Sequence, residues 1–390
     1  MASSTAMQGP ALGHGSVQTP QTTTLNEVRH EHPRLHQTVL NRVCGSTPLL
    51  TEARLISALH RCVSRRMAAA GVPGVQMSLS VGNRPTQTLA WGHANLTTRR
   101  RMTETTRFRM ASLAKPLSSL VFLRLVARGT FTLDEPLNLL LEEVVPHLCR
   151  SPLTARMLLS HRAQLPIIHP PHVPMNGTPG ATLTEALRGE HGTPAFSRDE
   201  PDGTLYTGAG WMLLEHCVRA RTGTTFSDLA AELVAQPLRL ASVSYADDAR
   251  MGPDVAEYHT PEGVPIPPTT SPATAATGLV SDTRDCVHAM RVLLDAARGT
   301  RADFLPSALA QDAIAPQPAD GGFSLTHFVY ARDPLTLTHG GVRPGFRATM
   351  TVFPTQRIVV CLATNSDNGF DAVKPWLGLL GSMARACRLP

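Results

Sequence analysis

The chain has 390 residues, enough to bury the core of one large domain or of two to three smaller ones. Hydrophobic residues make up 42% and charged residues 17%, which is typical of a globular protein and excludes a wholly disordered chain. The formal net charge is +6, but the arginines are scattered and only 5% of the residues are aromatic. A basic, aromatic surface for nucleic acid is therefore not predicted.

The seven cysteines are widely spaced, and none forms a C-x-x-C pair that would indicate a zinc ribbon or a redox site. Prolines interrupt the histidine-rich stretches 30–36 and 169–172, and no phosphate loop or dinucleotide fingerprint occurs, so no metal and no cofactor are expected. The first residues lack a secretory signal, and no apolar run predicts a membrane span. We therefore expect a cytoplasmic, reducing location and no membrane partner.

The first predicted elements follow an N-terminal segment, residues 1–50, that we expect to be disordered or extended because its beginning is rich in Ser, Thr, Gly, Pro and Gln. Residues 51–70 place apolar side chains about every 3.6 positions and predict a helix. The stretches 74–83 and 86–95 alternate apolar and polar residues. They predict two paired strands joined by a turn near Gly82.

Residues 112–128 predict a helix that ends at Gly129. Pro116 is tolerated only in the first turn of a helix, so Ser112 lies at or beside the helix N-terminus. The Pro-rich middle of the chain, residues 130–270, contains several short helical patterns. The remaining predicted elements are a helix at 283–298, three strands at 335–341, 346–354 and 357–365, and a last helix from about 371 to 387.

Short neighbouring strands joined by tight turns indicate an antiparallel sheet. Strands stand near both ends of the chain and helices fill its middle, so the predicted fold class is α+β, an antiparallel sheet flanked by helices with a helical insert domain. We assign residues 51–115 and 271–390 to the sheet domain and residues 116–270 to the mainly helical domain.

Lysine is nearly absent from this chain, and Lys115 is one of two lysines among 36 lysines and arginines. It follows Ser112 by three residues, so both side chains lie on one face of the predicted helix. A serine becomes a nucleophile when a base takes its proton; a buried lysine can be that base, whereas an arginine stays protonated. The pair indicates an activated serine, although an S-x-x-K spacing also arises by chance.

Five stretches carry a resemblance to a known family: 108–137 ("FRMASLAKPLSSLVFLRLVARGTFTLDEPL"), 157–166, 202–223, 276–285 and 339–365. In this order they resemble segments of the serine β-lactamase and penicillin-binding-protein superfamily, closest to its class C β-lactamase-like esterases, D-aminopeptidases and acyltransferases. Together they span about residues 60–385. The resemblance implies a β-lactamase/transpeptidase-like fold.

The resemblance also implies roles for single residues. Ser112 would be the acylated nucleophile, and Lys115 and Tyr206 would share the proton transfers; we assign the pair and not one base. The backbone N–H groups of Ser112 and Val342 would form the oxyanion hole. One rival interpretation places a class A-like serine-aspartate-asparagine element at 281–283, but the preceding Gly-Leu-Val predicts a structural turn that opens a helix.

The third family motif reads His339-Gly340-Gly341, where β-lactamases have lysine-threonine-glycine. A neutral histidine binds a carboxylate less firmly than lysine does, which argues against penicillin-like anionic substrates. A glycine at 341 lets a substrate lie against the strand edge. Arg343 either restores a cation for the substrate or is a surface arginine. Gly208 stands where the family often has an asparagine that contacts a substrate amide.

These features predict a serine hydrolase or acyltransferase that forms an acyl-enzyme on Ser112. Its partner would be a small-molecule acyl substrate, an ester or thioester of a small or natural-product compound. One alternative is an amidase or peptidase that acts on D-amino-acid or peptide substrates. A second alternative is a catalytically silent β-lactamase-like binding protein. The sequence leaves the oligomeric state open.

Overall fold

The computed structural model describes residues 61, 63–165, 173–174, 182–190, 204–245 and 252–371. The predicted N-terminal segment, both histidine-rich stretches and nearly all of the predicted last helix lie outside these residues. The described part of the predicted helix at 51–70 is helical from 63 to 70.

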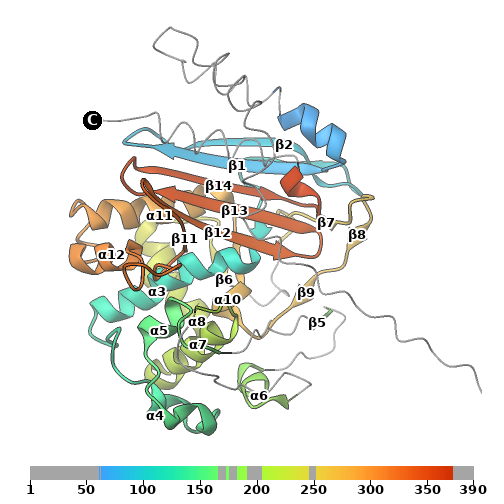
Figure 1. Ribbon diagram of the computed structural model, residues 1–390. Coiled ribbons are helices and arrows are strands. Elements are labelled where there is room, and N and C mark those ends of the chain that lie inside the picture. The colour runs from blue at the N-terminus through green and yellow to red at the C-terminus, as the bar shows by residue number, and fades with distance from the viewer. Residues whose placement is uncertain are drawn as a thin grey trace, which may run out of the picture. The chain divides into compact units, whose positions relative to one another are not determined.

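One seven-stranded antiparallel sheet combines strands from early and late parts of the chain (Figure 1). The strand order is β11-β12-β13-β14-β1-β2-β3. Near its centre β14 pairs with β1, so that Thr364 lies opposite Val75 and Ile358 opposite Val81. The bounds are β1 (Gly74–Val81), β2 (Gln87–Asn95), β3 (Arg100–Arg101), β11 (Phe328–Arg332), β12 (Leu335–Arg343), β13 (Phe346–Phe353) and β14 (Ile358–Thr364).

The predicted α+β class with one antiparallel sheet is confirmed. Helix α11 (Thr283–Ala297) packs on β1 and β14, and α12 (Ser307–Ile314) packs on α11. The buried side chains of α11 recur at helical spacing and face the sheet side, whereas the opposite side chains are polar. The helices of the middle region lie below the sheet in Figure 1.

Most of the remaining helices are short, and α3 runs through the centre of them. Eleven of its fourteen residues are buried, and it contacts α11, α8 and α10. The bounds are η2 (Ala111–Leu113), α3 (Ala114–Ala127), α4 (Asn138–Leu141), η3 (Pro146–Arg150), α5 (Ala155–Leu159), α6 (Leu183–Leu187), α7 (Ala209–Thr222), α8 (Phe226–Ala230), the π-helical η5 (Ala231–Ala235), α9 (Gln236–Leu238) and α10 (Thr274–Thr277).

Several helices begin at residues whose side chains accept backbone N–H groups, and some end at glycines that can take a left-handed conformation. The side chains of Thr154, Thr225 and Asp282 accept backbone N–H groups at the starts of α5, α8 and α11. Gly129 and Gly223 take left-handed backbone conformations just after α3 and α7. Asp282 is thus the N-cap of α11, as the structural-turn interpretation of 281–283 predicts.

Three smaller sheets connect the helical part to the main sheet. One has the order β4-β10-β6, and two-stranded pairs form between β5 and β9 and between β7 and β8. Their bounds are β4 (Phe108–Arg109), β5 (Val173–Pro174), β6 (Ser244–Tyr245), β7 (Tyr258–His259), β8 (Pro265–Ile266), β9 (Thr269–Thr270) and β10 (Leu279–Ser281). The domain boundaries at 115/116 and 270/271 stay a prediction.

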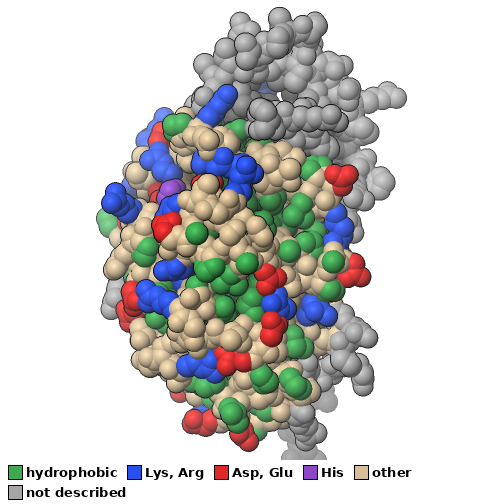
Figure 2. All heavy atoms as spheres, turned by 90° about the vertical axis from the view of Figure 1, so that its left-hand side faces the viewer, with side chains coloured by type: hydrophobic (Ala, Val, Ile, Leu, Met, Phe, Trp, Pro, Cys, Tyr) green, Lys and Arg blue, Asp and Glu red, His purple; other side chains and the backbone are tan. Residues whose placement is uncertain are grey.

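Charges of both signs share the surface. Figure 2 shows Lys and Arg side chains interspersed with acidic ones over the face that it presents. Ion pairs join oppositely charged side chains, among them Arg357 with Asp295 at 2.5 Å and Arg284 with Glu104 at 2.5 Å. Within the described ranges, the structure contains no helix of the length and apolarity that a membrane crossing requires.

Candidate active site

The turn that carries Ser112 is fixed by its neighbours. Strand β4 enters it and pairs with β10, and the N–H of Met110 donates a hydrogen bond of 2.8 Å to the carbonyl of Leu279. Ala111 then takes a positive φ of 49°, a conformation uncommon outside glycine. The chain therefore turns sharply into η2, and Ser112 lies immediately before α3.

The Ser112 and Lys115 side chains meet, as their spacing predicts. Lys115 Nζ donates to Ser112 Oγ at 3.0 Å and to the carbonyl oxygen of Ala276 at 3.2 Å. Lys115 is 2% exposed, whereas Ser112 is half-buried. The amine is thus held inside the protein beside a serine that is only partly buried.

Tyr206 lies beside Lys115 and contacts the amine with its ring and not with its hydroxyl. Lys115 Nζ is 5.2 Å from the centroid of the Tyr206 ring. Among the described residues, the Tyr206 hydroxyl makes no hydrogen bond to Ser112 or Lys115. The structure therefore brings together the three residues assigned to catalysis, while their proton-transfer roles stay a prediction.

His161 holds the Tyr206 segment from both sides. Its carbonyl accepts the N–H of Leu205 at 3.0 Å, and its Nδ1 accepts the N–H of Thr207 at 3.4 Å. The His161 and Tyr206 rings also pack at 4.7 Å between centroids. His161 follows α5 and has a positive φ of 55°, so the chain turns at this residue toward Tyr206. His161 therefore positions Tyr206, a role that its motif alone does not reveal.

Aromatic rings complete the surroundings of Tyr206. Phe323 stacks on it with centroids 6.4 Å apart, and Phe328 and His339 lie at 5.0 Å and 5.8 Å. Phe323 and Phe328 belong to the loop and strand before β12, where no motif stands. Sequence analysis missed both because only the fold brings this loop to Tyr206.

Strand β12 packs its third-motif glycine against the nucleophile turn. A Cβ on Gly341 would lie 2.4 Å from the carbonyl oxygen of Met110 and 3.5 Å from a carbon of Leu113. A Cβ on Gly340 would meet nothing closer than the Ala348 carbonyl at 3.7 Å. Glycine at 341 thus lets the chain itself approach, a reason that differs from the predicted room for substrate. That both glycines line a bound substrate stays a prediction.

His339 is buried and neutral. Its Nδ1–H donates to the Gly340 carbonyl at 2.9 Å, which leaves Nε2 as an acceptor. Burial, and then the Lys115 charge, hold the pKa of this imidazole well below its usual range. The predicted weakness of His339 as a carboxylate ligand is consistent with both observations.

The structure gives different surroundings to the remaining assigned residues, Val342, Arg343 and Gly208. Val342 is 57% exposed, and its N–H as an oxyanion donor stays a prediction. Arg343 is only 6% exposed and donates to the Thr269 hydroxyl at 3.2 Å, so the alternative that it is a surface arginine is wrong. Gly208 begins α7 with an ordinary φ of −76°, a conformation open to any residue.

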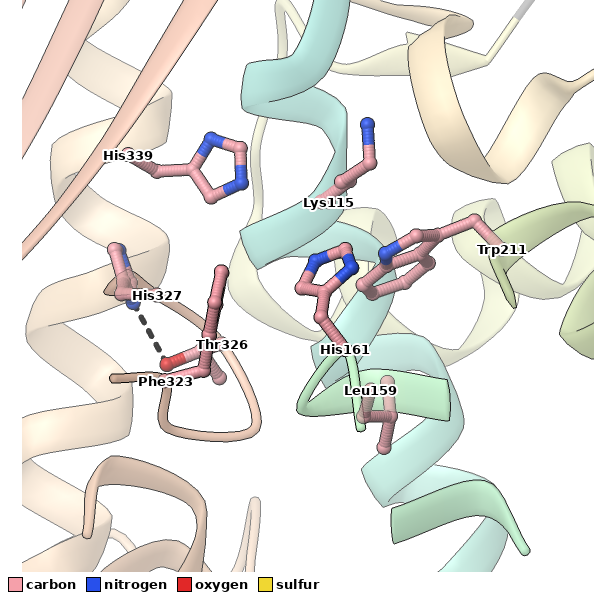
Figure 3. Close-up of a pocket in the computed structure, with 8 residues that line it drawn as sticks. All are labelled: Lys115, Leu159, His161, Trp211, Phe323, Thr326, His327 and His339. Atoms are coloured by element: carbon pink, nitrogen blue, oxygen red, sulfur yellow. Dashed lines mark hydrogen bonds between the residues drawn. The ribbon is translucent and has the colours of Figure 1, made fainter. Parts of the chain in front are cut away.

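A small pocket adjoins Lys115, and it is lined by Lys115, Leu159, His161, Trp211, Phe323, Thr326, His327 and His339. In Figure 3, His339 and His327 lie on its left side and His161 and Trp211 toward its right. Among the described residues, His339 Nε2, His327 Nε2 and Trp211 Nε1 are buried without a hydrogen-bond partner. Three of the residues that line the pocket thus carry buried polar atoms for which the described part of the chain supplies no hydrogen bond.

The other two histidines of this pocket are neutral as well. Burial lowers the pKa of His327 to about 3, and burial followed by the Lys115 charge lowers that of His161 to about 3. Within the described residues, no three His, Cys, Asp or Glu side chains are grouped as metal ligands. Lys115 is thus surrounded by uncharged imidazoles.

Comparisons with known proteins agree with this geometry. A family model described as β-lactamase matches residues 59–381. A D-aminopeptidase from Cereibacter sphaeroides (strain KD131) is 26% identical over 289 residues, which cover 71% of this chain and 54% of the relative. The chain thus spans about half the length of the curated D-aminopeptidases that it matches.

A second relative is similar over a shorter stretch. Esterase EstB from Burkholderia gladioli is 44% identical over 79 residues, which are 20% of each protein. Among solved structures, that of SurE matches with a TM-score of 0.69 and 22% identity over 84% of this chain and 75% of SurE. The structural likeness supports the β-lactamase/transpeptidase-like fold.

Proposed function

Because this chain belongs to the β-lactamase family of serine hydrolases, we propose that it forms an acyl-enzyme on Ser112 from the ester or thioester of a small molecule. The observation that carries the proposal is the 3.0 Å contact between Lys115 Nζ and Ser112 Oγ. An amine buried beside a half-exposed serine is the arrangement that nucleophilic catalysis requires.

The proposed reaction has two stages. In the first, Ser112 Oγ bonds to the acyl carbon, the bond to the leaving alcohol or thiol breaks, and the serine proton passes through Lys115 and Tyr206 to the leaving group. In the second, water or another acceptor nucleophile attacks the ester and releases Ser112. The N–H groups of Ser112 and Val342 would stabilise the oxyanion, each worth about 3 kcal/mol of the barrier.

Two observations support an ester or thioester over an amide. Gly208 offers no side chain to a substrate amide, and a stretch of the chain is similar to esterase EstB. A neutral, buried His339 further disfavours a substrate held by its carboxylate.

The second candidate is an amidase or peptidase acting on D-amino-acid substrates, which the similarity to D-aminopeptidases over most of this chain favours. Turnover of p-nitrophenyl esters and of D-aminoacyl anilides separates the two candidates. Turnover of the anilides that equals or exceeds that of the esters would overturn the ester proposal.

Labelling with a fluorophosphonate, followed by intact-protein mass spectrometry, tests the acyl-enzyme itself. We expect one adduct on the unsubstituted protein and on Ser119→Ala, which alters a serine of the following helix α3, but none on Ser112→Ala. An unlabelled parent protein, or equal labelling of Ser112→Ala, would contradict the proposal.

A further inference from the structure

Glu215 is a buried carboxylate outside the motifs that define the family. It lies on α7, where it is 7% exposed, among residues that are mostly apolar. Its Oε2 accepts the backbone N–H of Ala275 at 2.9 Å. Because a buried carboxylate is costly unless it is hydrogen-bonded, this contact fixes the side chain and the backbone that it meets.

The backbone that Glu215 meets is the turn α10. This helix has only four residues, Thr274–Thr277, so its position depends on the groups that contact it rather than on its own hydrogen bonds. Ser118 Oγ donates to the carbonyl of Ala275 at 2.7 Å. Glu215 and Ser118 therefore hold opposite sides of the same residue, one at its N–H and the other at its carbonyl.

The next carbonyl along α10 reaches the catalytic amine. Ala276 O accepts from Lys115 Nζ at 3.2 Å, while Ser112 Oγ lies at 3.0 Å from the same nitrogen. These two acceptors define where the amine lies, because its third side faces the Tyr206 ring at 5.2 Å. A lysine side chain has four rotatable bonds, and without the Ala276 carbonyl it would sample other rotamers.

We propose that Glu215 is a positioning residue of the active site: it holds α10 so that the Ala276 carbonyl keeps Lys115 Nζ on Ser112 Oγ. This inference rests on the proposed acyl-enzyme function. Glu215 acts through two backbone groups and touches neither substrate nor nucleophile. What it supplies is a hydrogen-bond acceptor at a fixed distance, so a glutamine, which keeps an oxygen at the same place, should replace it.

The test compares Glu215→Met, which keeps the length and loses the acceptor, with Glu215→Gln, which keeps both. The readouts are the single-turnover rate constant for acylation by a p-nitrophenyl ester and the ester concentration that gives half the maximal rate. We expect Glu215→Met to acylate at least about tenfold more slowly at an unchanged half-saturating concentration, because a displaced base lowers the rate of the chemical step. Glu215→Gln should stay within about threefold of the parent.

Val218→Ala is the matched control, since it truncates another buried side chain of α7 and leaves the hydrogen bonds from Glu215 and Ser118 to Ala275 in place. At a similar loss of thermal stability, it should keep the parent's acylation rate. If Glu215→Met does not fold, Ser118→Ala releases the same turn from its other side and should slow acylation by about tenfold, well outside the threefold range allowed for Glu215→Gln.

Three outcomes would overturn the inference. They are parental acylation by Glu215→Met, equally slow acylation by the Met and Gln variants, and, where Glu215→Met does not fold, parental acylation by Ser118→Ala. A parent protein that forms no acyl-enzyme would instead refute the proposed function, and the positioning role with it. The parent rate thus separates the two failures.

Discussion

On one side of the candidate site, Lys115 Nζ donates hydrogen bonds to Ser112 Oγ and to the Ala276 carbonyl. On the other side, Tyr206 is surrounded by the rings of His161, Phe323, Phe328 and His339. We call these the nucleophile side and the tyrosine side. Hydrogen bonds set direction and distance for the reacting atoms themselves, whereas the ring contacts around Tyr206 span interplanar angles from 7° to 57° and tolerate more variation. We therefore expect substitutions on the nucleophile side to reduce activity strongly and single substitutions on the tyrosine side to reduce it moderately.

The nucleophile side should fail most severely in Lys115→Arg. An arginine keeps the charge but cannot give up its proton, so we expect the acylation rate to fall by about 10³-fold or more. The measurement is the burst of p-nitrophenol release, with circular dichroism to confirm folding. A variant that retains its burst would show that another group serves as the base.

Acid should destabilise the protein through the neutral histidines of the pocket beside the tyrosine side. The pKa values of His161 and His327 are about 3 in the folded protein, against about 6.5 for an unfolded histidine. Below pH 6.5 the unfolded chain therefore binds more protons, and the free energy of unfolding falls as the pH falls toward 3. Each histidine should lower the free energy of unfolding by about 2 kcal/mol between pH 6.5 and pH 5.

Urea unfolding at several pH values measures this slope. His327→Gln should reduce the slope below pH 6.5 and leave the stability difference between pH 7 and 8 unchanged. An identical slope in His327→Gln would show that this imidazole is not the group that titrates.

Alanine substitutions at two adjacent glycines of β12 compare a tightly packed backbone position on the nucleophile side with an open position. Gly341→Ala places a Cβ 2.4 Å from the Met110 carbonyl and should cost about 1–3 kcal/mol of stability and slow acylation. Gly340→Ala meets only ordinary contact at 3.7 Å and should be nearly neutral. Thermal melts and acylation rates check both, and equal effects of the two substitutions would contradict this packing.

The smallest effect is expected from a single ring on the tyrosine side. Phe328→Leu removes one of several rings around Tyr206. It should raise the activation free energy of turnover by about 1 kcal/mol, which corresponds to about a fivefold loss of turnover. Steady-state ester hydrolysis measures it, with Tyr330→Leu, which alters an exposed ring of the same strand, as the control. A loss as large as that of Lys115→Arg would remove the distinction between the two sides.

Much of the fold follows from local sequence. The helix after Ser112, the strands of β1, β2 and β12–β14, and the cap at Asp282 are confirmed, because periodicity and capping involve residues close in the chain. Strand β11 was missed: its residues Phe328–Arg332 lie at the sheet edge and are half-buried or exposed, so they carry no clear alternation. Four of the assigned site residues lie together, namely Ser112, Lys115, Tyr206 and His339, while the roles of all assigned residues stay predictions.

The sequence by itself predicted the nucleophile side, because Ser112 and Lys115 are three residues apart where η2 leads into α3 and the chain uses lysine almost nowhere else. Only the tertiary structure decided that Glu215 reaches Lys115 through α10, that His161 holds Tyr206, and that Arg343 is buried. Those contacts join segments far apart in the sequence. Their geometry depends on how the sheet and helices pack, which no local pattern encodes.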